Sequence, residues 1–362
     1  MANKTARLGD LATYINGYAF KPADWGETGL PIIRIQDLTG NSYQLNRYDG
    51  EYPERIEVND GDVLISWSAS LGVYVWQRGK ALLNQHIFRV VFDKLPVNKD
   101  YFVFAVEHKL AEMESKTHGA TMKHIVKKDF DGTTIPYPPI EKQAEIADHL
   151  RRITSLIDRQ TEQLLLLDQL VKSRFIELFG DIVLNPFGWE KDYLGVVCDV
   201  RDGTHDSPHY HSTGFPLVTS KNVTGGEIDL TDCSLISEAD FNKINERSKV
   251  DMGDIIMPMI GTVGKPVIVN VKPNFAIKNV SLIKFKDDSR VLNTFIRSLL
   301  QSDYFDDAVL SKVRGGTQKF ISLGDIRKLV VIVPPMALQE QFAAFVEQTD
   351  KSKLCGKMEV AA

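Results

Sequence analysis

The chain has little cysteine, and none of it is arranged to bind a metal. Its 362 residues include only Cys198, Cys233 and Cys355, which are scattered and form no Cys-x-x-Cys pair. This odd set argues against structural zinc and favours a reducing cytoplasm. The first ten residues are polar, and no apolar run approaches the roughly eighteen residues of a membrane span. Neither a signal peptide nor a membrane anchor is therefore expected.

Positive charge is also scarce. The chain has 43 Lys and Arg against 48 Asp and Glu, which gives a formal net charge of −5. A protein that binds nucleic acid alone usually has a basic surface. A DNA-binding role therefore requires basic residues gathered on one face, or a partner that supplies much of the phosphate contact. The length suffices for two or three domains, and 43% apolar residues are ordinary for a globular protein.

Convincing catalytic motifs are missing. No Walker loop, His-Glu-x-x-His or Gly-x-Ser-x-Gly occurs. Asn185-Pro186-Phe187 resembles the Asn-Pro-Pro-aromatic tetrapeptide of amino-methyltransferases, but it lacks the second proline and no glycine-rich cofactor loop lies nearby. Three histidines fall within residues 205–211, where the Asp, Ser and Pro around them favour a turn over a metal site. We therefore expect a binding module with no catalytic residue, bound metal or cofactor of its own.

An internal repeat stands out against these absences. Gly119, Lys123, Pro138-Pro139 and Gln143 return as Gly315, Lys319, Pro334-Pro335 and Gln339, and each pair lies 196 positions apart. A duplicated module predicts an object with pseudo-two-fold symmetry. Such an object suits a two-fold ligand, of which duplex DNA is the common one.

Weaker anchors extend the repeat to the start of each half. The offset between the two halves grows from 186 at the first anchor to 196 in the segments above, so insertions lie between the anchors, and the intervening residues differ almost completely. This pattern indicates one frame that carries two different sets of surface residues. The anchors are Leu8-Gly9 with Leu194-Gly195, Gly29 with Gly214, Gly61 with Gly253, and Gly72 with Gly264.

The repeat predicts an α+β protein in four parts. Residues 1–140 and 181–336 are expected to form two similar mixed α/β domains. Residues 141–180 are expected to form a long helix, and residues 337–362 a second, shorter helix with a tail. In the first domain, 31–35 and 63–67 have the pattern of strands and 101–115 that of a helix. Pro138-Pro139 marks the start of the long helix and Gly180 its end.

The long helix carries an apolar stripe with heptad spacing, interrupted by Gln160 and Arg174. At about 39 residues it would be about 58 Å long. Such a stripe needs another helix along most of its length. In the second helix Thr349 and Lys353 stand where apolar residues stand in the first, so the stripe fades there. The seam residues are Ile146, Leu150, Ile153, Ile157, Leu164, Leu167, Val171 and Leu178.

Two polar loops with glycine recur in each half, at 66–72 with 258–264 and at 118–125 with 314–321. Glycine lets backbone amides approach phosphate, and basic side chains add charge. The alternative interpretation is a purely structural turn. With His205 and the adjacent pair Lys221 and Asn222 added, the candidates for DNA contact are Ser68, Ser70, Gly72, His118, Gly119, Thr121, Lys123, His205, Lys221, Asn222, Thr262, Gly264, Arg314, Gly315, Gly316, Thr317 and Lys319.

The whole layout resembles the specificity subunit of type I restriction–modification systems. The resemblance rests on the repeated segments 135–143 and 331–339, on Asp202-Gly203-Thr204-His205 and on Asn185–Trp189, and it covers about residues 7–350. It implies two target-recognition domains, each followed by a spacer helix, with the two helices packed as an antiparallel coiled coil. The short second helix departs from this pattern.

The resemblance also implies a function. Each domain would read one part of a split site in double-stranded DNA, and the helices would act as a ruler and as the dock for two DNA methyltransferase subunits. S-adenosylmethionine, ATP and Mg²⁺ would belong to those subunits and to further restriction subunits that translocate and cleave DNA. The chain itself would be a non-catalytic reader in the cytoplasm.

Two other functions remain open at this point. The chain could be a fragment of a methyltransferase–specificity fusion enzyme, which a cofactor-binding segment upstream would support. It could instead be a helix-mediated scaffold that recognises no DNA. Dissimilar surfaces on a shared frame argue against the scaffold, because a scaffold gains nothing from varying them.

Overall fold

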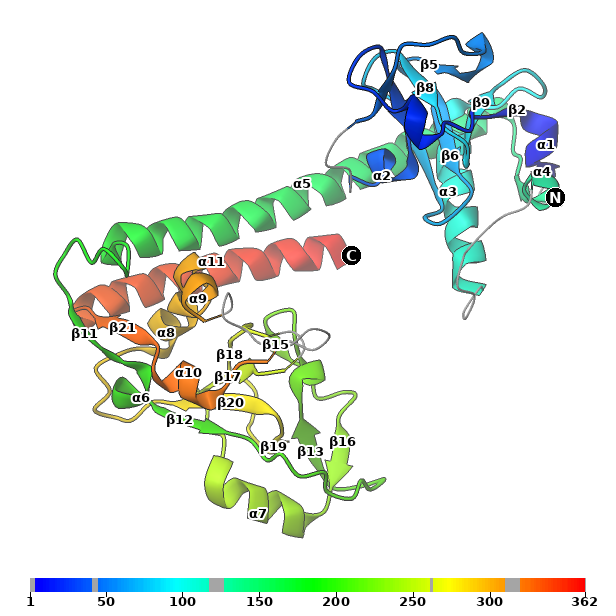
Figure 1. Ribbon diagram of the computed structural model, residues 1–362. Coiled ribbons are helices and arrows are strands. Elements are labelled where there is room, and N and C mark those ends of the chain that lie inside the picture. Colours follow the sequence, from blue (N-terminus) through cyan, green and yellow to red (C-terminus); the bar gives the residue numbers. More distant parts are fainter. Residues whose placement is uncertain (1–3, 41–44, 117–126, 261–262, 310–319, 362) are drawn as a thin grey trace. The chain divides into compact units, whose positions relative to one another are not determined.

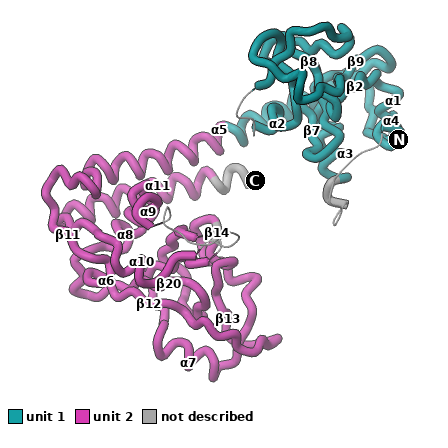
Figure 2. The backbone as a smooth tube through the Cα atoms, in the orientation of Figure 1, with its two compact units in different colours: residues 1–158 teal, residues 159–362 magenta. Residues whose placement is uncertain are grey.

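A computed structural model describes residues 4–40, 45–116, 127–260, 263–309 and 320–361 (Figure 1). The chain forms two compact units, residues 1–158 and 159–362 (Figure 2). The helix α5 (Ile140–Phe179) begins in the first unit and ends in the second. Each unit is described by itself below.

The first unit contains two four-stranded sheets. One is antiparallel, in the order β2 (Thr13–Asn16), β9 (Ile87–Val91), β6 (Val63–Ser66), β7 (Gly72–Val75). The other has the order β4 (Arg47–Tyr48), β3 (Leu30–Ile33), β8 (Ala81–Leu83), β5 (Glu57–Val58), with β3 parallel to β8. The terminal pair is β1 (Thr5–Arg7) with β10 (Thr134–Pro136). Its helices are α1 (Leu8–Leu11), α2 (Ile35–Leu38), α3 (Lys99–Lys116) and α4 (Lys127–Gly132).

The second unit repeats this topology. Its antiparallel sheet has the order β12 (Asp199–Asp202), β20 (Val280–Lys284), β17 (Ile255–Pro258), β18 (Val267–Ile268). Its mixed sheet has the order β16 (Ser234–Ile236), β13 (Phe215–Val218), β19 (Ala276–Ile277), with β13 parallel to β19. The terminal pair is β11 (Glu190–Tyr193) with β21 (Val330–Val333). A hairpin of β14 (Val223–Thr224) and β15 (Glu227–Ile228) is added, with α6 (Leu194–Val197), α7 (Glu238–Ser248), α8 (Asn293–Leu299), α9 (Asp303–Ala308) and α10 (Leu323–Arg327).

The predicted fold class is confirmed: the protein is α+β, with two similar domains and two long helices. The repeated glycine anchors have a physical reason at Gly61 and Gly253. Both have positive φ, 90° and 86°, in the turn before the central strands β6 and β17. The Gly61 amide donates to the Trp76 carbonyl at 2.7 Å, and that of Gly253 to the Val269 carbonyl at 2.9 Å. Glycine adopts this left-handed conformation without a Cβ penalty.

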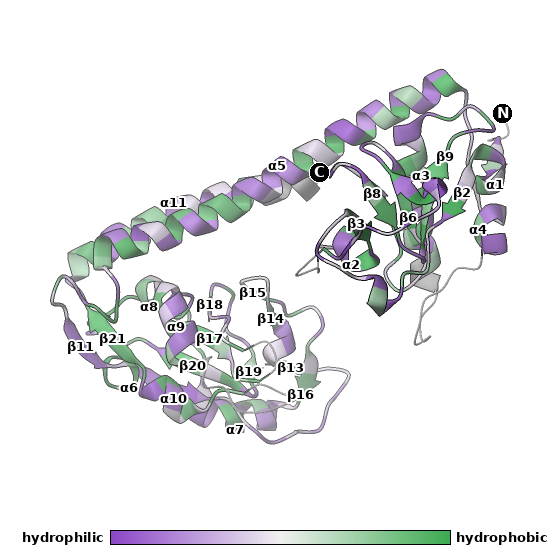
Figure 3. Ribbon diagram, turned by 45° about the horizontal axis from the view of Figure 1, so that its top comes forward, coloured by the Kyte–Doolittle hydropathy of each residue, from purple (hydrophilic) through white to green (hydrophobic). Residues whose placement is uncertain are grey.

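Each domain is held by apolar residues from the two sheets and from the helix that covers them. In the first unit, Val63 and Ile65 of β6 face Phe102 and Val106 of α3, while Leu64 faces the mixed sheet. This alternation is the period of a strand buried on both faces. Figure 3 shows hydrophobic residues concentrated on β6 and β8, whereas α5 alternates along its length.

In the second unit, α5 packs antiparallel against α11 (Met336–Ala361). Phe342 near the start of α11 contacts Phe175 and Phe179 near the end of α5, with ring centroids 5.6 and 5.4 Å apart. Further along, Lys353 pairs with Asp168 at 2.6 Å. A Cβ built on Gly356 would lie 3.6 Å from Leu164 Cδ2, so the two helices approach closely there. Among the described residues, no helix is long and apolar enough to cross a membrane.

The predicted bounds of α5 hold within one residue, and its end has the expected cause. Gly180 has φ 77°, and its amide donates to the Ile176 carbonyl at 2.8 Å, as at a glycine-terminated helix. The predicted seam residues Leu164, Leu167, Val171 and Leu178 are half-buried, and so is Ile146. Leu150, Ile153 and Ile157 are exposed in the chain alone, by 36, 53 and 42%.

Candidate DNA interface

One end of the antiparallel sheet in the first unit contains a close crossing of two backbones. Strand β2 ends at Asn16, and a Cβ on the next residue, Gly17, would overlap the carbonyl oxygen of Asn84. The Gly17 amide donates to the Ile87 carbonyl at 3.2 Å. Tyr18 then lies parallel to Asn84, and its carbonyl accepts from the Gln85 amide at 2.8 Å. Only glycine allows so close an approach.

The second unit has the same crossing with different side chains. A Cβ on Gly203 would overlap the carbonyl oxygen of Ile277, and the Gly203 amide donates to the Val280 carbonyl at 2.9 Å. Thr204 lies parallel to Lys278, and its carbonyl accepts from the Asn279 amide at 3.2 Å. Gly17 and Gly203 are therefore equivalent. The sequence comparison missed this pair, although the offset of 186 is that of the first anchors, because the residues around each glycine differ.

A glycine-containing hairpin turn lies at the same end of each sheet. In the first unit, the turn after β6 begins beside the crossing: the Trp67 amide donates to the His86 carbonyl at 3.2 Å, and their rings lie 5.1 Å apart. In the second unit, Pro258 at the end of β17 pairs with Val280, which directly follows Asn279. We call this set of turn, crossing glycine and crossing loop the crossing end of each domain.

In the second unit the crossing end is joined by the start of a further segment. Ile260 in the turn pairs with Phe320, and the Ile321 amide donates to the Met259 carbonyl at 2.9 Å. Phe320 directly follows residues 310–319, which hold the second recurrent glycine loop. The last two residues of the second recurrent loop, Phe320 and Ile321, therefore lie beside the turn after β17.

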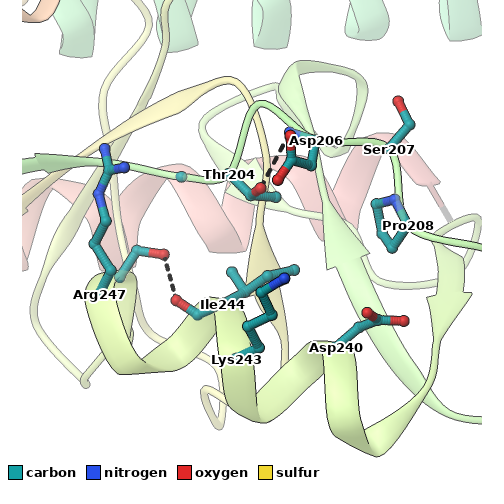
Figure 4. A pocket seen from close by; sticks show the side chains of 10 residues that line it. Thr204, Asp206, Ser207, Pro208, Asp240, Lys243, Ile244 and Arg247 are labelled. Carbon is teal, nitrogen blue, oxygen red and sulfur yellow. Dashed lines mark hydrogen bonds between the residues drawn. The ribbon is translucent and has the colours of Figure 1, made fainter.

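His205 is held in a chain of polar contacts at the second crossing end. Its Nδ1 lies 2.9 Å from Asn279 Oδ1 and its Nε2 lies 2.9 Å from Asp202 Oδ2. Asp202 is largely buried and also pairs with Arg247 of α7. The His205 side chain remains 62% exposed. Next to it, Thr204, Asp206, Ser207 and Pro208 form one wall of a pocket, and Asp240, Lys243 and Arg247 of α7 form the other (Figure 4).

The opposite end of each sheet is anchored to a long helix by a glutamine. Gln143 of α5 is fully buried; its Nε2 donates to the Pro138 carbonyl at 2.8 Å, and its Oε1 accepts from the Asn98 amide at 3.0 Å. Gln339 of α11, also fully buried, donates to the Pro334 carbonyl and accepts from the Leu292 amide, both at 2.8 Å. The spacing of Pro-Pro and Gln that recurs in both halves therefore places a buried glutamine where it links the start of a long helix to its domain. We call each of these hydrogen-bonded links, at Gln143 and at Gln339, a joint.

The anchored end of the second unit also holds a charged cluster. Burial raises the pKa of Asp254, which the Lys284 ammonium at 2.6 Å opposes. The same ammonium hydrogen-bonds Asp251 and lowers the pKa of that carboxyl. Asp254 caps the Gly253 turn, since its Oδ2 accepts from the Asp251 amide at 2.7 Å. These groups are structural and lie at the sheet end opposite the crossing.

The structure places only some of the predicted DNA contacts. Ser68 is half-buried and Ser70 exposed in the first hairpin turn, Gly72 begins β7, and Gly264 has φ 80° in the second turn. Lys221 is exposed, whereas Asn222 is buried. The Asn222 side-chain oxygen accepts from the Thr219 amide at 3.0 Å, so this carboxamide is engaged in a turn. Outside the described residues lie His118, Gly119, Thr121, Lys123, Thr262, Arg314, Gly315, Gly316, Thr317 and Lys319. No group of side chains suited to a metal ion occurs in the part of the chain that the structure describes.

Comparison with known families identifies the family of the chain. Residues 2–167 and 186–356 both match the family described as the type I restriction modification DNA specificity domain. The chain belongs to this family. It is the specificity subunit of a type I restriction–modification system, which determines the DNA target that is recognised, and this subunit is non-catalytic. The two matches cover the two halves of the repeat.

Similar proteins cover nearly the whole chain. The Type I restriction enzyme EcoBI specificity subunit of Escherichia coli is 24% identical over 371 residues, covering 94% of this chain and 78% of that protein. The Type I restriction enzyme MjaVIII specificity subunit of Methanocaldococcus jannaschii is 24% identical over 372 residues, covering 96% of this chain and 86% of that protein. The crystal structure of the type I S subunit from M. genitalium shares the fold, with a TM-score of 0.59 at 15% identity, covering 99% of this chain and 92% of that one.

Proposed function

We propose that this specificity subunit reads a two-part site in double-stranded DNA, one part with each domain. The observation that carries the proposal is the duplicated crossing end. Both domains have the same strand order in the antiparallel sheet and a crossing glycine beside a hairpin turn, yet different polar side chains stand on this frame. Base readout depends on those side chains, whereas the frame only positions them.

We further propose that α5 and α11 bind two methyltransferase subunits. Leu165, Leu166 and Leu170 of α5 are 60, 56 and 49% exposed in the second unit. Neighbouring large apolar side chains on the outside of a helix mark a protein interface. S-adenosylmethionine would belong to these subunits, and ATP and Mg²⁺ to the restriction subunits. Partners that share the phosphate contacts would account for an overall charge of −5. The assembled complex would act on DNA in the cytoplasm.

The reading function is tested by mapping modified bases. The chain is expressed with its methyltransferase subunits, and methylated adenines in the host DNA are located by sequencing. We expect a single sequence in two parts separated by a fixed spacer. The purified chain alone, incubated with labelled S-adenosylmethionine and DNA, is expected to transfer no methyl group. Methylation without sequence preference by the complex, or transfer by the chain alone, would contradict the proposal.

A matched pair of variants tests the dock. Leu165→Glu changes an exposed residue, so we expect unchanged thermal stability but loss of methyltransferase binding in size-exclusion chromatography. Leu164→Glu changes the half-buried neighbour that faces Gly356 of α11. It should lower the stability of the chain itself, because it places a charge between two helices. If the Leu165→Glu chain forms the complex normally, the outer face of α5 is not the dock.

A further inference from the structure

We propose that the crossing loops read bases, through Gln85 in the first domain and Asn279 in the second. This inference rests on the proposed function and assigns it to particular side chains. Both residues occupy the same backbone position, since each donates its amide to the carbonyl of the residue after the crossing glycine, Tyr18 or Thr204. Carboxamides pair with base edges in the major groove, most often with N6 and N7 of adenine.

Backbone strain is concentrated at the same place. Within the described part of the chain, four non-glycine residues have positive φ, and three of them lie at the crossing ends. They are Ala69 at 59°, His86 at 76° and Asn279 at 56°. The cost of such conformations is retained mainly where a binding or catalytic surface needs a side chain aimed in one direction. The strain thus marks the same loops in both domains.

In the first domain several polar side-chain groups of the loop make no hydrogen bond within the described part of the chain. The half-buried side chain of Gln85 has no hydrogen-bond partner among the described residues. Asn84 Oδ1 and His86 Nδ1 are covered, and they also lack partners there. Buried polar atoms are usually paired, so two unpaired ones in neighbouring residues are unusual for a loop that serves the fold alone. Tyr18, 43% exposed, lies beside them.

In the second domain the carboxamide is oriented by its neighbours. His205 Nδ1 lies 2.9 Å from Asn279 Oδ1, so the imidazole holds the Asn279 carboxamide at one of its two ends and leaves the other end for a ligand. Asp202 fixes the other nitrogen of the ring. His205 is therefore a positioning residue for Asn279. Lys278 hydrogen-bonds Ser207 at 2.6 Å, so this basic side chain also lies on the loop surface. The same frame thus presents different groups in the two domains.

The test compares each carboxamide with one at the other end of the same strand. Gln85→Ala is paired with Gln77→Ala, because residues 77 and 85 flank β8 and Gln77 is exposed. Asn279→Ala is paired with Asn274→Ala, because these flank β19 and Asn274 is exposed. Each variant is expressed with the methyltransferase subunits, methylated adenines are mapped, and thermal stability of the purified complex is measured.

We expect Gln85→Ala to reduce discrimination at one base position by about 5- to 150-fold, in one part of the site only. Asn279→Ala should do the same in the other part. His205→Ala should reproduce the base position affected by Asn279→Ala. Both controls should methylate the wild-type sequence.

Three results would overturn the assignment while the wild-type complex still methylates a two-part site. These are an unchanged base preference in Gln85→Ala and Asn279→Ala, an equal loss of methylation on all sequences, or equal shifts in the controls. In each case base reading lies elsewhere and the proposed function survives. Failure of the wild-type complex to select any sequence would instead remove the proposed function itself.

Discussion

Gln143 and Gln339 show how a single side chain sets the direction of a long helix. Each carboxamide spans from the first turn of its helix to a loop of its own domain, and each bonds only to backbone atoms. Gln339 makes a third bond, from Nε2 to the Arg290 carbonyl at 3.0 Å. Hydrogen bonds in a buried site are costly to leave unmade, so the joint is stiff.

Replacing Gln339 with Leu should destabilise the protein by about 2–4 kcal/mol. The substitution keeps an apolar volume but leaves the Leu292 amide and the Pro334 and Arg290 carbonyls without their partner. Urea denaturation followed by circular dichroism measures the free energy of unfolding. Gln341→Leu, an exposed residue of the same helix, is the control and should change it by less than about 0.5 kcal/mol. Equal effects of both variants would show that the joint does not carry the stability.

The three cysteines should react in an order set by burial. Burial raises the pKa of the Cys198 thiol to about 12 and that of Cys233 to about 11, whereas Cys355 is exposed on α11. Because the thiolate is the nucleophile, Cys198 stays neutral and unreactive near pH 8. Iodoacetamide labelling with mass spectrometry should modify Cys355 first and Cys198 only on unfolding. Fast labelling of Cys198 in the native protein would mean that this site opens locally.

At the scale of elements, the pairing of α5 with α11 rests on aromatic residues. Phe175, Phe179, Phe295 of α8 and Phe342 are buried and contact one another with ring centroids 4.8–5.6 Å apart. Edge-to-face and stacked rings at these distances add to the energy of apolar burial. The cluster therefore ties both helices to the second domain.

Phe342→Ala should cost about 3–5 kcal/mol, because it removes a fully buried ring and leaves a cavity. Thermal and denaturant unfolding of the full chain measures this cost. Ile176→Ala is the control, since Ile176 lies beside Phe175 on α5 but is 51% exposed. If Phe342→Ala is as mild as the control, the aromatic cluster is not what holds the two helices together.

The sequence predicted α5 within one residue at each end, because its signals are local: prolines before the start, and glycine after the last turn. Which side chains of α5 are buried was harder to predict from the sequence. The heptad stripe passes through Arg174 and Leu178, whereas the fully buried positions are the next residues, Phe175 and Phe179. A contact with α8, more than 100 residues away, decides this, and periodicity along one helix carries no information about it.

The candidate site, too, was predictable from the sequence only in part. The hairpin turns and His205 were predicted as candidates from the sequence, because glycine and polar residues mark turns. Gln85 and Asn279 were not found, since each is defined by the backbone crossing of a distant glycine. The equivalence of Gly17 and Gly203 is visible only when strand pairing is known, because the residues around the two glycines differ.

At the scale of the whole molecule, the joints explain how domains with different surfaces can share one helical frame. In the first unit the joint bonds of Gln143 go to the Asn98 amide and the Pro138 carbonyl. Neither bond depends on the identity of a domain side chain. Any domain with the same loop can therefore dock on α5, as the second domain does on α11 through Leu292.

Residues 1–137 should consequently be exchangeable for the matching domain of another specificity subunit. A junction after Tyr137 keeps β1 paired with β10, and Gln143 finds a backbone amide in the incoming loop. We expect the hybrid, expressed with its methyltransferase subunits, to methylate a site in which one part is new. The other part and the spacer should be unchanged, because the second domain and α5 are intact. Modified-base sequencing measures this, and a change in both parts at once would mean that the domains do not read DNA separately.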